Sequence, residues 1–100
     1  MSRFRDEFVS HEHLFALGRD ARSGKAYLAI PVSNRLVDYE EYFEISEESL
    51  ERFAADPDAA EEFVEACRAR RKDDLLILKP GSDRGVPRRP PRWAGPSESQ

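Results

Sequence analysis

Residues 36–65, LVDYEEYFEISEESLERFAADPDAAEEFVE, are the stretch that decides the fold. They contain twelve of the twenty acidic residues and one base, Arg52, so their net charge is −11. An alternating run, LVDYEEYFEI, passes directly into a segment with helical spacing. The sequence therefore predicts a strongly acidic strand-and-helix unit that the rest of the chain supports.

Residues 37–45 have the period of two that is typical of a β-strand with one buried and one solvated face. One predicted face carries Val37, Tyr39, Glu41, Phe43 and Ile45, and the other carries Leu36, Asp38, Glu40, Tyr42 and Glu44. Glu41 interrupts the apolar face. A bulge, a position at the rim of the core, or a hydrogen-bonded buried carboxylate would each account for it.

Two helices are predicted after this strand. Ser46 is a good N-cap, and Glu47 and Glu48 complement the positive end of a helix. Asp56-Pro57 would end the first helix and open the second. The predicted buried positions are Leu50, Phe53 and Ala54 in the first helix, and Ala60, Phe63, Val64 and Cys67 in the second.

The segment before the acidic stretch predicts a β-hairpin. The runs HLFALG (13–18) and KAYLAIPV (25–32) are separated by RDARSG, which supplies typical turn residues. In the second run, Leu28, Ile30 and Val32 would share one face. The first ten residues are ambiguous, because a helix would place Phe4, Phe8 and Phe15 on one face, whereas residues 13–17 also have the pattern of an extended run.

The last predicted strand is the apolar run LLIL at 75–78, which suits a strand covered on both faces or paired in the middle of the sheet. The predicted order is β-β-β-α-α-β, an α+β fold in which two helices pack on one face of a small, mainly antiparallel sheet. Residues 1–80 would form one domain. Residues 81–100, rich in proline and arginine, are expected to form a disordered, flexible tail.

Composition narrows the function classes. The single cysteine excludes an internal disulfide and fits a reducing compartment. No apolar run approaches the roughly 18 residues of a membrane span, and MSRFRDEF lacks the apolar core of a signal peptide. The one-sided charge of residues 36–65 would repel nucleic acid and attract a cationic protein. We expect a cytoplasmic protein with no cofactor and no membrane partner.

Catalytic and metal-binding patterns are weak. His11 and His13 would project to the same side of a strand, but two ligands do not complete a metal site. Cys67 falls on the predicted apolar stripe, where a small hydrophobic side chain is wanted. Neither a phosphate-binding glycine loop nor a GxSxG or HExxH motif is present. We therefore predict that the protein is not an enzyme.

The acidic face of the strand is the predicted partner-binding site. Tyr is favoured as an anchor in interfaces, and surrounding carboxylates steer a basic partner. The candidate residues are Asp38, Glu40, Tyr42, Glu44, Glu47 and Glu48. A plain solvated face, with some acids serving only as helix caps, is the competing interpretation.

These features predict a non-enzymatic acidic binding protein. Small size, an acidic surface and the lack of a catalytic motif are shared by many inhibitor and immunity proteins, a likeness of composition alone. The most concrete hypothesis is an immunity- or antitoxin-type inhibitor of a cationic toxin enzyme. One alternative is a metal-binding accessory protein or enzyme that uses His11 and His13. Another is an adaptor acting through the PxxPxR pattern at 87–92.

Overall fold

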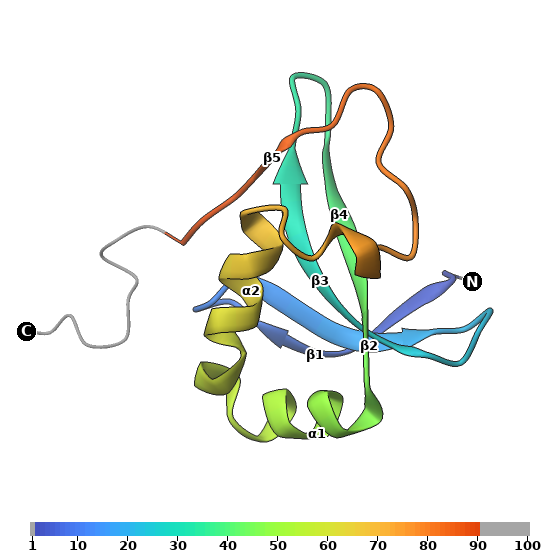
Figure 1. The fold of residues 1–100 in the computed structure, drawn as a ribbon, viewed down its shortest axis with the longest axis vertical. Helices are drawn as coiled ribbons and strands as arrows, with labels where there is room; N and C mark the ends of the chain where they lie inside the picture. The colour runs from blue at the N-terminus through green and yellow to red at the C-terminus, as the bar shows by residue number, and fades with distance from the viewer. Residues whose placement is uncertain (1, 91–100) are drawn as a thin grey trace, which may run out of the picture.

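Four alternating segments pair into an antiparallel sheet in the computed structural model, which describes residues 2–90. The strands are β1 (Phe4–Ser10), β2 (Phe15–Asp20), β3 (Ala26–Ser33), β4 (Asp38–Ile45) and β5 (Val86–Pro87). The first four lie side by side in chain order, and β5 pairs with the end of β3, beyond the residues that pair with β2. Figure 1 shows a strongly twisted sheet, with β1 and β2 running across the lower parts of β3 and β4.

The helices α1 (Glu47–Ala55) and α2 (Glu61–Arg68) cover one face of this sheet. Leu28, Ile30 and Val32 of β3 are fully buried and face Phe53 and Val64 of the helices in one core. Burial of each such side chain is worth roughly 1.5–3 kcal/mol relative to exposure. The predicted α+β class, with two helices on one face of an antiparallel sheet, is confirmed.

The predicted helix starts are largely confirmed. The Ser46 hydroxyl accepts a hydrogen bond from the Ser49 amide at 3.0 Å and caps α1. Pro57 opens a 3-10 turn, η1 (Pro57–Ala60), that leads into α2. The side chain of Asp56 makes no capping hydrogen bond, so the second helical segment begins without the predicted cap.

Residues 4–10 form strand β1, so a helix there is wrong. The pairing of β1 with β2 shifts between Asp6 and Phe8. Such a bulge moves later side chains to the opposite face. Phe4 consequently packs on the face away from the helices, while Phe8 packs against the helix-side core. Because of this change of face, the sequence of residues 4–10 lacks the regular alternation of apolar and polar residues by which a strand is recognised.

The apolar run at 75–78 is not a regular strand. It follows the 3-10 turn η2 (Asp73–Leu75), and its pairing to β4 consists of one bridge, Phe43 to Leu76, and a hydrogen bond from the Ile77 amide to the Tyr42 carbonyl at 2.9 Å. Leu76 packs on the helix side of β4 and Ile77 on the other side. The run therefore lies along the edge of the sheet beside β4, and Leu78 is exposed, so the prediction of a strand covered on both faces or paired in the middle of the sheet is wrong.

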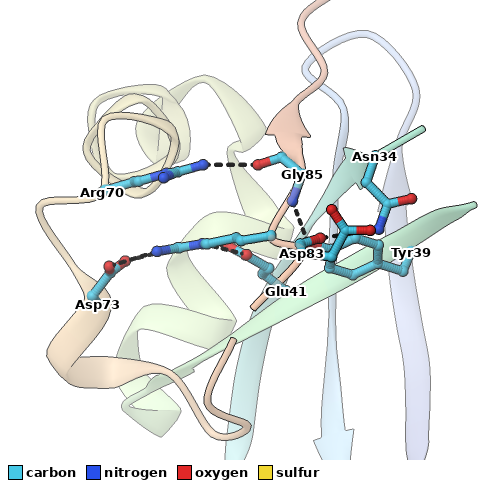
Figure 2. Close-up of polar contacts among 8 residues, drawn as sticks. Asn34, Tyr39, Glu41, Arg70, Asp73, Asp83 and Gly85 are labelled. Atoms are coloured by element: carbon cyan, nitrogen blue, oxygen red, sulfur yellow. Dashed lines mark hydrogen bonds and ion pairs between the residues drawn. The ribbon is translucent and has the colours of Figure 1, made fainter. Parts of the chain in front are cut away.

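The boundary predicted at residue 80 also needs correction, because residues 83–89 lie against the domain. Arg84 forms ion pairs with the buried Glu41 at 2.8 Å and with Asp73 at 2.8 Å. Figure 2 shows both carboxylates converging on this guanidinium. Glu41 is thus the hydrogen-bonded buried carboxylate among the three explanations its position allowed.

The backbone next to Arg84 is held equally closely. The Gly85 amide donates to the Tyr39 hydroxyl at 2.7 Å, and the Gly85 carbonyl accepts from Arg70 at 2.7 Å (Figure 2). A Cβ on Gly85 would lie 2.4 Å from the Ser33 carbonyl oxygen, so only glycine permits this approach. We call residues 83–89 the C-terminal strap. The predicted flexible tail can apply only to residues 91–100, which lie outside the described residues.

Candidate functional site

The face of the sheet away from the helices carries a small aromatic cluster. We call it the open face and define it by the buried Ala16, Tyr27 and Ala29 with the partly exposed Phe4 and Tyr42. The rings of Phe4 and Tyr42 stack with centroids 3.8 Å apart, and Tyr27 meets the Tyr42 ring edge-on at 5.0 Å. The twist of the sheet thereby brings the first and fourth strands into contact across this face.

A carboxylate of β1 is tied into this cluster. The Tyr27 hydroxyl donates a hydrogen bond to Asp6 Oδ1 at 2.5 Å. This hydroxyl passes over Gly18, where a Cβ would lie 2.6 Å from it and 2.0 Å from the Arg5 carbonyl oxygen. Burial, together with this bond to an anion, raises the pKa of Tyr27 well above its usual range. Asp6 is therefore held in place by a neutral donor.

Asp6 and Glu40 both line one pocket of about 200 Å³ beside the aromatic cluster. Its apolar wall includes Ala16, Ala29 and Pro31. Desolvation raises the pKa of Glu40, the nearby negative charge of Asp6 raises it further, and a hydrogen bond with Tyr42 partly offsets both effects. Two carboxylates thus face one apolar-walled space.

Among the described residues, 2–90, no cation forms an ion pair with the carboxylate of Asp6 or Glu40. Arg88 lines the same pocket, but the only carboxylate near its guanidinium among these residues is Asp38, at 4.0 Å. A cationic group entering the pocket would therefore relieve repulsion that the fold itself leaves in place.

The other predicted site residues are mostly engaged already. Asp38, Glu40, Tyr42 and Glu44 alternate along β4 on the open face. The Asp38 carboxylate accepts from the Ser33 hydroxyl at 2.6 Å, and Glu44 lies 3.3 Å from Lys25. Glu47, at the start of α1, pairs with Arg19, whereas Glu48 is exposed. The structure therefore singles out Glu40 within the predicted acidic face.

Tyr42 differs from an exposed anchor. Its ring is only half-exposed, because Phe4 and Tyr27 pack against it. Burial and the neighbouring charges of Glu40 and Asp6 raise the pKa of Tyr42 to about 12, so its hydroxyl stays protonated at neutral pH. The ring therefore belongs to the aromatic cluster beside the pocket and contributes to folding.

The histidine pair predicted as a metal alternative is not brought together as a ligand set. Residues 11–14 form a turn, and His13 is buried with Nε2 2.8 Å from Asp58 Oδ1. His11 is exposed and lines the open-face pocket. Among residues 2–90, no group of three or more histidine, cysteine or carboxylate side chains has the spacing of a metal site.

Cys67 has the environment of a core residue. It is a fully buried residue of α2, and burial raises the pKa of its thiol to about 12. A nucleophilic cysteine needs the opposite shift, because the thiolate is the reactive form.

Sequence reasoning missed Asp6, which the structure places opposite Glu40. The alternation of Phe4 and Asp6 is a usable signal only if residues 4–10 are recognised as a strand, and the bulge conceals that pattern. The meeting of Asp6 with Glu40 also depends on the twist of the sheet, which no local pattern encodes.

Comparison with protein-family models, curated proteins and solved structures finds no match for this chain. Among the described residues, no helix has both the length and the apolar composition needed to cross a membrane.

Proposed function

We propose that this is a non-enzymatic binding protein whose open face captures a cationic side chain of a partner protein. The observation that carries the proposal is that Asp6 and Glu40 line one pocket and that, within residues 2–90, neither forms an ion pair. The pocket volume of about 200 Å³ is in the range of one long side chain. A lysine or arginine would place its aliphatic stem on Ala16, Ala29 and Pro31 and its charge between the carboxylates.

The partner in this proposal is a basic protein, and the most concrete form is a toxin enzyme that the chain neutralises in the cytoplasm. Asp38 and Glu44 flank Glu40 on β4 and would steer the approach of a basic surface. Nucleic acid does not suit the site, because the phosphates would meet the same carboxylates. The adaptor alternative loses support, because Pro87 pairs with β3 and the Arg88 amide donates to Pro31, so half of the PxxPxR pattern is engaged.

The test is affinity capture of partners from native cell extract, at low and at high salt, with three forms of the protein. The wild type is compared with the Asp6→Asn/Glu40→Gln double variant and with a matched control, Glu51→Gln/Glu61→Gln, which removes two exposed charges on the helices. We expect the first double variant to bind an identified partner about tenfold or more weakly, and the control to bind like the wild type.

Equal binding by all three forms would refute the pocket as the site. If the captured partner is an enzyme, inhibition of its activity by the wild type, and not by the Asp6→Asn/Glu40→Gln variant, would support the inhibitor form of the proposal. Inhibition by both would exclude the pocket from that role.

A further inference from the structure

A second groove lies on the helix layer, away from the open face. It is formed where α1 and α2 meet at an angle (Figure 1) and has a volume of about 660 Å³. Phe53, Phe63, Ala59 and Ala66 provide its apolar lining. Phe53 and Phe63 contact each other with ring centroids 6.0 Å apart. This groove plays no part in the proposed capture of a cation.

Three cations surround this apolar floor. Arg52 comes from α1, and Arg71 and Lys72 come from the turn after α2. The Arg52 guanidinium lies over the Phe53 ring at 5.8 Å, and the Lys72 ammonium over the Phe63 ring at 5.7 Å. Within residues 2–90, none of these three cations forms an ion pair. Other arginines of the domain, Arg3, Arg19 and Arg68, do form ion pairs. Two of the three cations, Arg52 and Lys72, therefore contact aromatic faces rather than carboxylates.

The end of α2 explains how two of these cations reach the groove. Arg70 adopts φ 63°, and the amides of Arg71 and Arg70 donate to the carbonyls of Ala66 and Cys67. This is the Schellman pattern, which reverses the chain at the end of a helix. The Schellman motif normally has glycine at the left-handed position. Here Arg70 adopts that conformation, and its guanidinium donates to the Gly85 carbonyl of the C-terminal strap. The turn is thereby fixed, and Arg71 and Lys72 line the groove.

From this charge complementarity we propose that the groove docks a short acidic segment of a protein, in which an apolar side chain is flanked by carboxylates. The apolar side chain would cover Phe63 and Ala66, and the carboxylates would meet Arg52, Arg71 and Lys72. Glu62 also lines the groove, and Glu51 and Glu61 of the same helices are exposed. A long polyanion such as nucleic acid would therefore be repelled on either side, whereas a short segment concentrates its charge on the cations.

The test uses three fluorescein-labelled peptides and fluorescence anisotropy with the full chain. The probe EEFLEE combines charge with an apolar centre, EESSEE keeps only the charge, and QQFLQQ keeps only the apolar centre. We expect EEFLEE to bind more tightly than either control peptide, with an affinity that falls as salt rises.

A variant pair locates the site. Arg71→Gln/Lys72→Gln should weaken EEFLEE binding about tenfold, since each removes one accessible charge pair. The control Arg22→Gln/Arg35→Gln removes two exposed charges elsewhere and should bind like the wild type. Thermal unfolding of both variants checks that each remains folded.

Three results would overturn the proposal. Equal weakening by both variants would show only a general charge effect. Tighter binding of a ten-nucleotide single-stranded DNA than of EEFLEE, lost in Arg71→Gln/Lys72→Gln, would assign the groove to nucleic acid. Self-association in sedimentation experiments, abolished by the same variant, would assign it to a second copy of this chain.

Discussion

Asp20 shows how one buried carboxylate organises the N-terminal hairpin. Both of its oxygens accept from Arg3 at 2.8 Å, and it also accepts from the Arg22 amide at 2.9 Å and the Ser23 hydroxyl at 3.0 Å. The Arg3 hydrogen bonds are the largest cause that holds the pKa of Asp20 far below its usual range. A lowered pKa means that the folded state prefers the ionised carboxylate.

The first prediction follows from the lowered pKa of Asp20. Asp20→Asn should be less stable than the wild type at neutral pH, where the carboxylate is ionised in the folded and unfolded states alike. The difference should shrink as pH falls below the ordinary aspartate value of 3.8, because the wild type then gains a proton on unfolding. Urea unfolding at pH 7 and near pH 2.5 measures it. A difference that stays constant over this range would contradict the role of the charge.

Tyr42 carries the second prediction. Because its ring stacks on Phe4 and meets Tyr27, Tyr42→Ala should lower the free energy of unfolding by roughly 2 kcal/mol, even without a partner. Tyr42→Phe keeps the stacked ring and should leave stability within about 0.5 kcal/mol of the wild type. Chemical denaturation of both variants separates packing from hydrogen bonding. A stable Tyr42→Ala variant would show that the aromatic cluster does not support the fold.

At the residue scale, the sequence showed that Glu41 is out of place on an apolar strand face, but it did not show which residue pairs with it. An acid on the apolar face of a predicted strand signals a buried partner or an irregularity. The partner, Arg84, lies 43 positions away in a segment that has few apolar side chains. Local patterns report periodicity and capping, whereas an ion pair of this sequence separation depends on the finished fold.

The C-terminal strap shows the same limit at the scale of an element. Its strand β5 has two residues, too few to show a period, and its attachment relies on Arg84 and on backbone contacts at Gly85. By contrast, the hairpin of β2 and β3 and the capped helix α1 follow from alternation, turn residues and Ser46. Long elements with their own periodicity were predictable, and elements held by side chains from elsewhere were not.

The third prediction concerns this strap. Arg84→Ala should destabilise the protein by about 3 kcal/mol, because Glu41 would remain buried without its cation. Gly85→Ala should also destabilise it, since the new Cβ would collide with the Ser33 carbonyl. Thermal melting of both variants, with exposed Gly81→Ala as the control, tests whether the strap belongs to the domain. Unchanged melting midpoints would show that the strap does not stabilise the domain and that the domain ends at residue 80.

At the scale of the whole molecule, two surfaces of opposite charge lie on the two sides of the sheet. The open face presents Asp6 and Glu40, and the helix layer presents Arg52, Arg71 and Lys72. Within residues 2–90, none of these five side chains forms an ion pair. The net charge of −4 conceals this division. Charge counting from the sequence identified the acidic strand, but the basic groove emerges only when the two helices and the turn after α2 are brought together.

The fourth prediction is that the two surfaces act independently. Asp6→Asn/Glu40→Gln should leave the affinity of the groove for EEFLEE unchanged within about twofold, and Arg71→Gln/Lys72→Gln should not alter capture of the basic partner. Distant sites without shared contacts normally contribute additively. Anisotropy and affinity capture on each variant and on the fourfold combination measure this, and strong coupling between the two would show that they form one site.

The account rests most directly on the state of Glu40, which carboxyl-carbon NMR can follow as pH is varied. Because desolvation and the Asp6 charge disfavour its ionised form, the pKa of Glu40 should lie above the ordinary value of 4.5 and fall in Asp6→Asn. Binding of the basic partner should lower it further in the wild type. A pKa at or below 4.5 in the free protein, unchanged by Asp6→Asn, would show that the carboxylate is already satisfied and would remove the basis for cation capture on the open face.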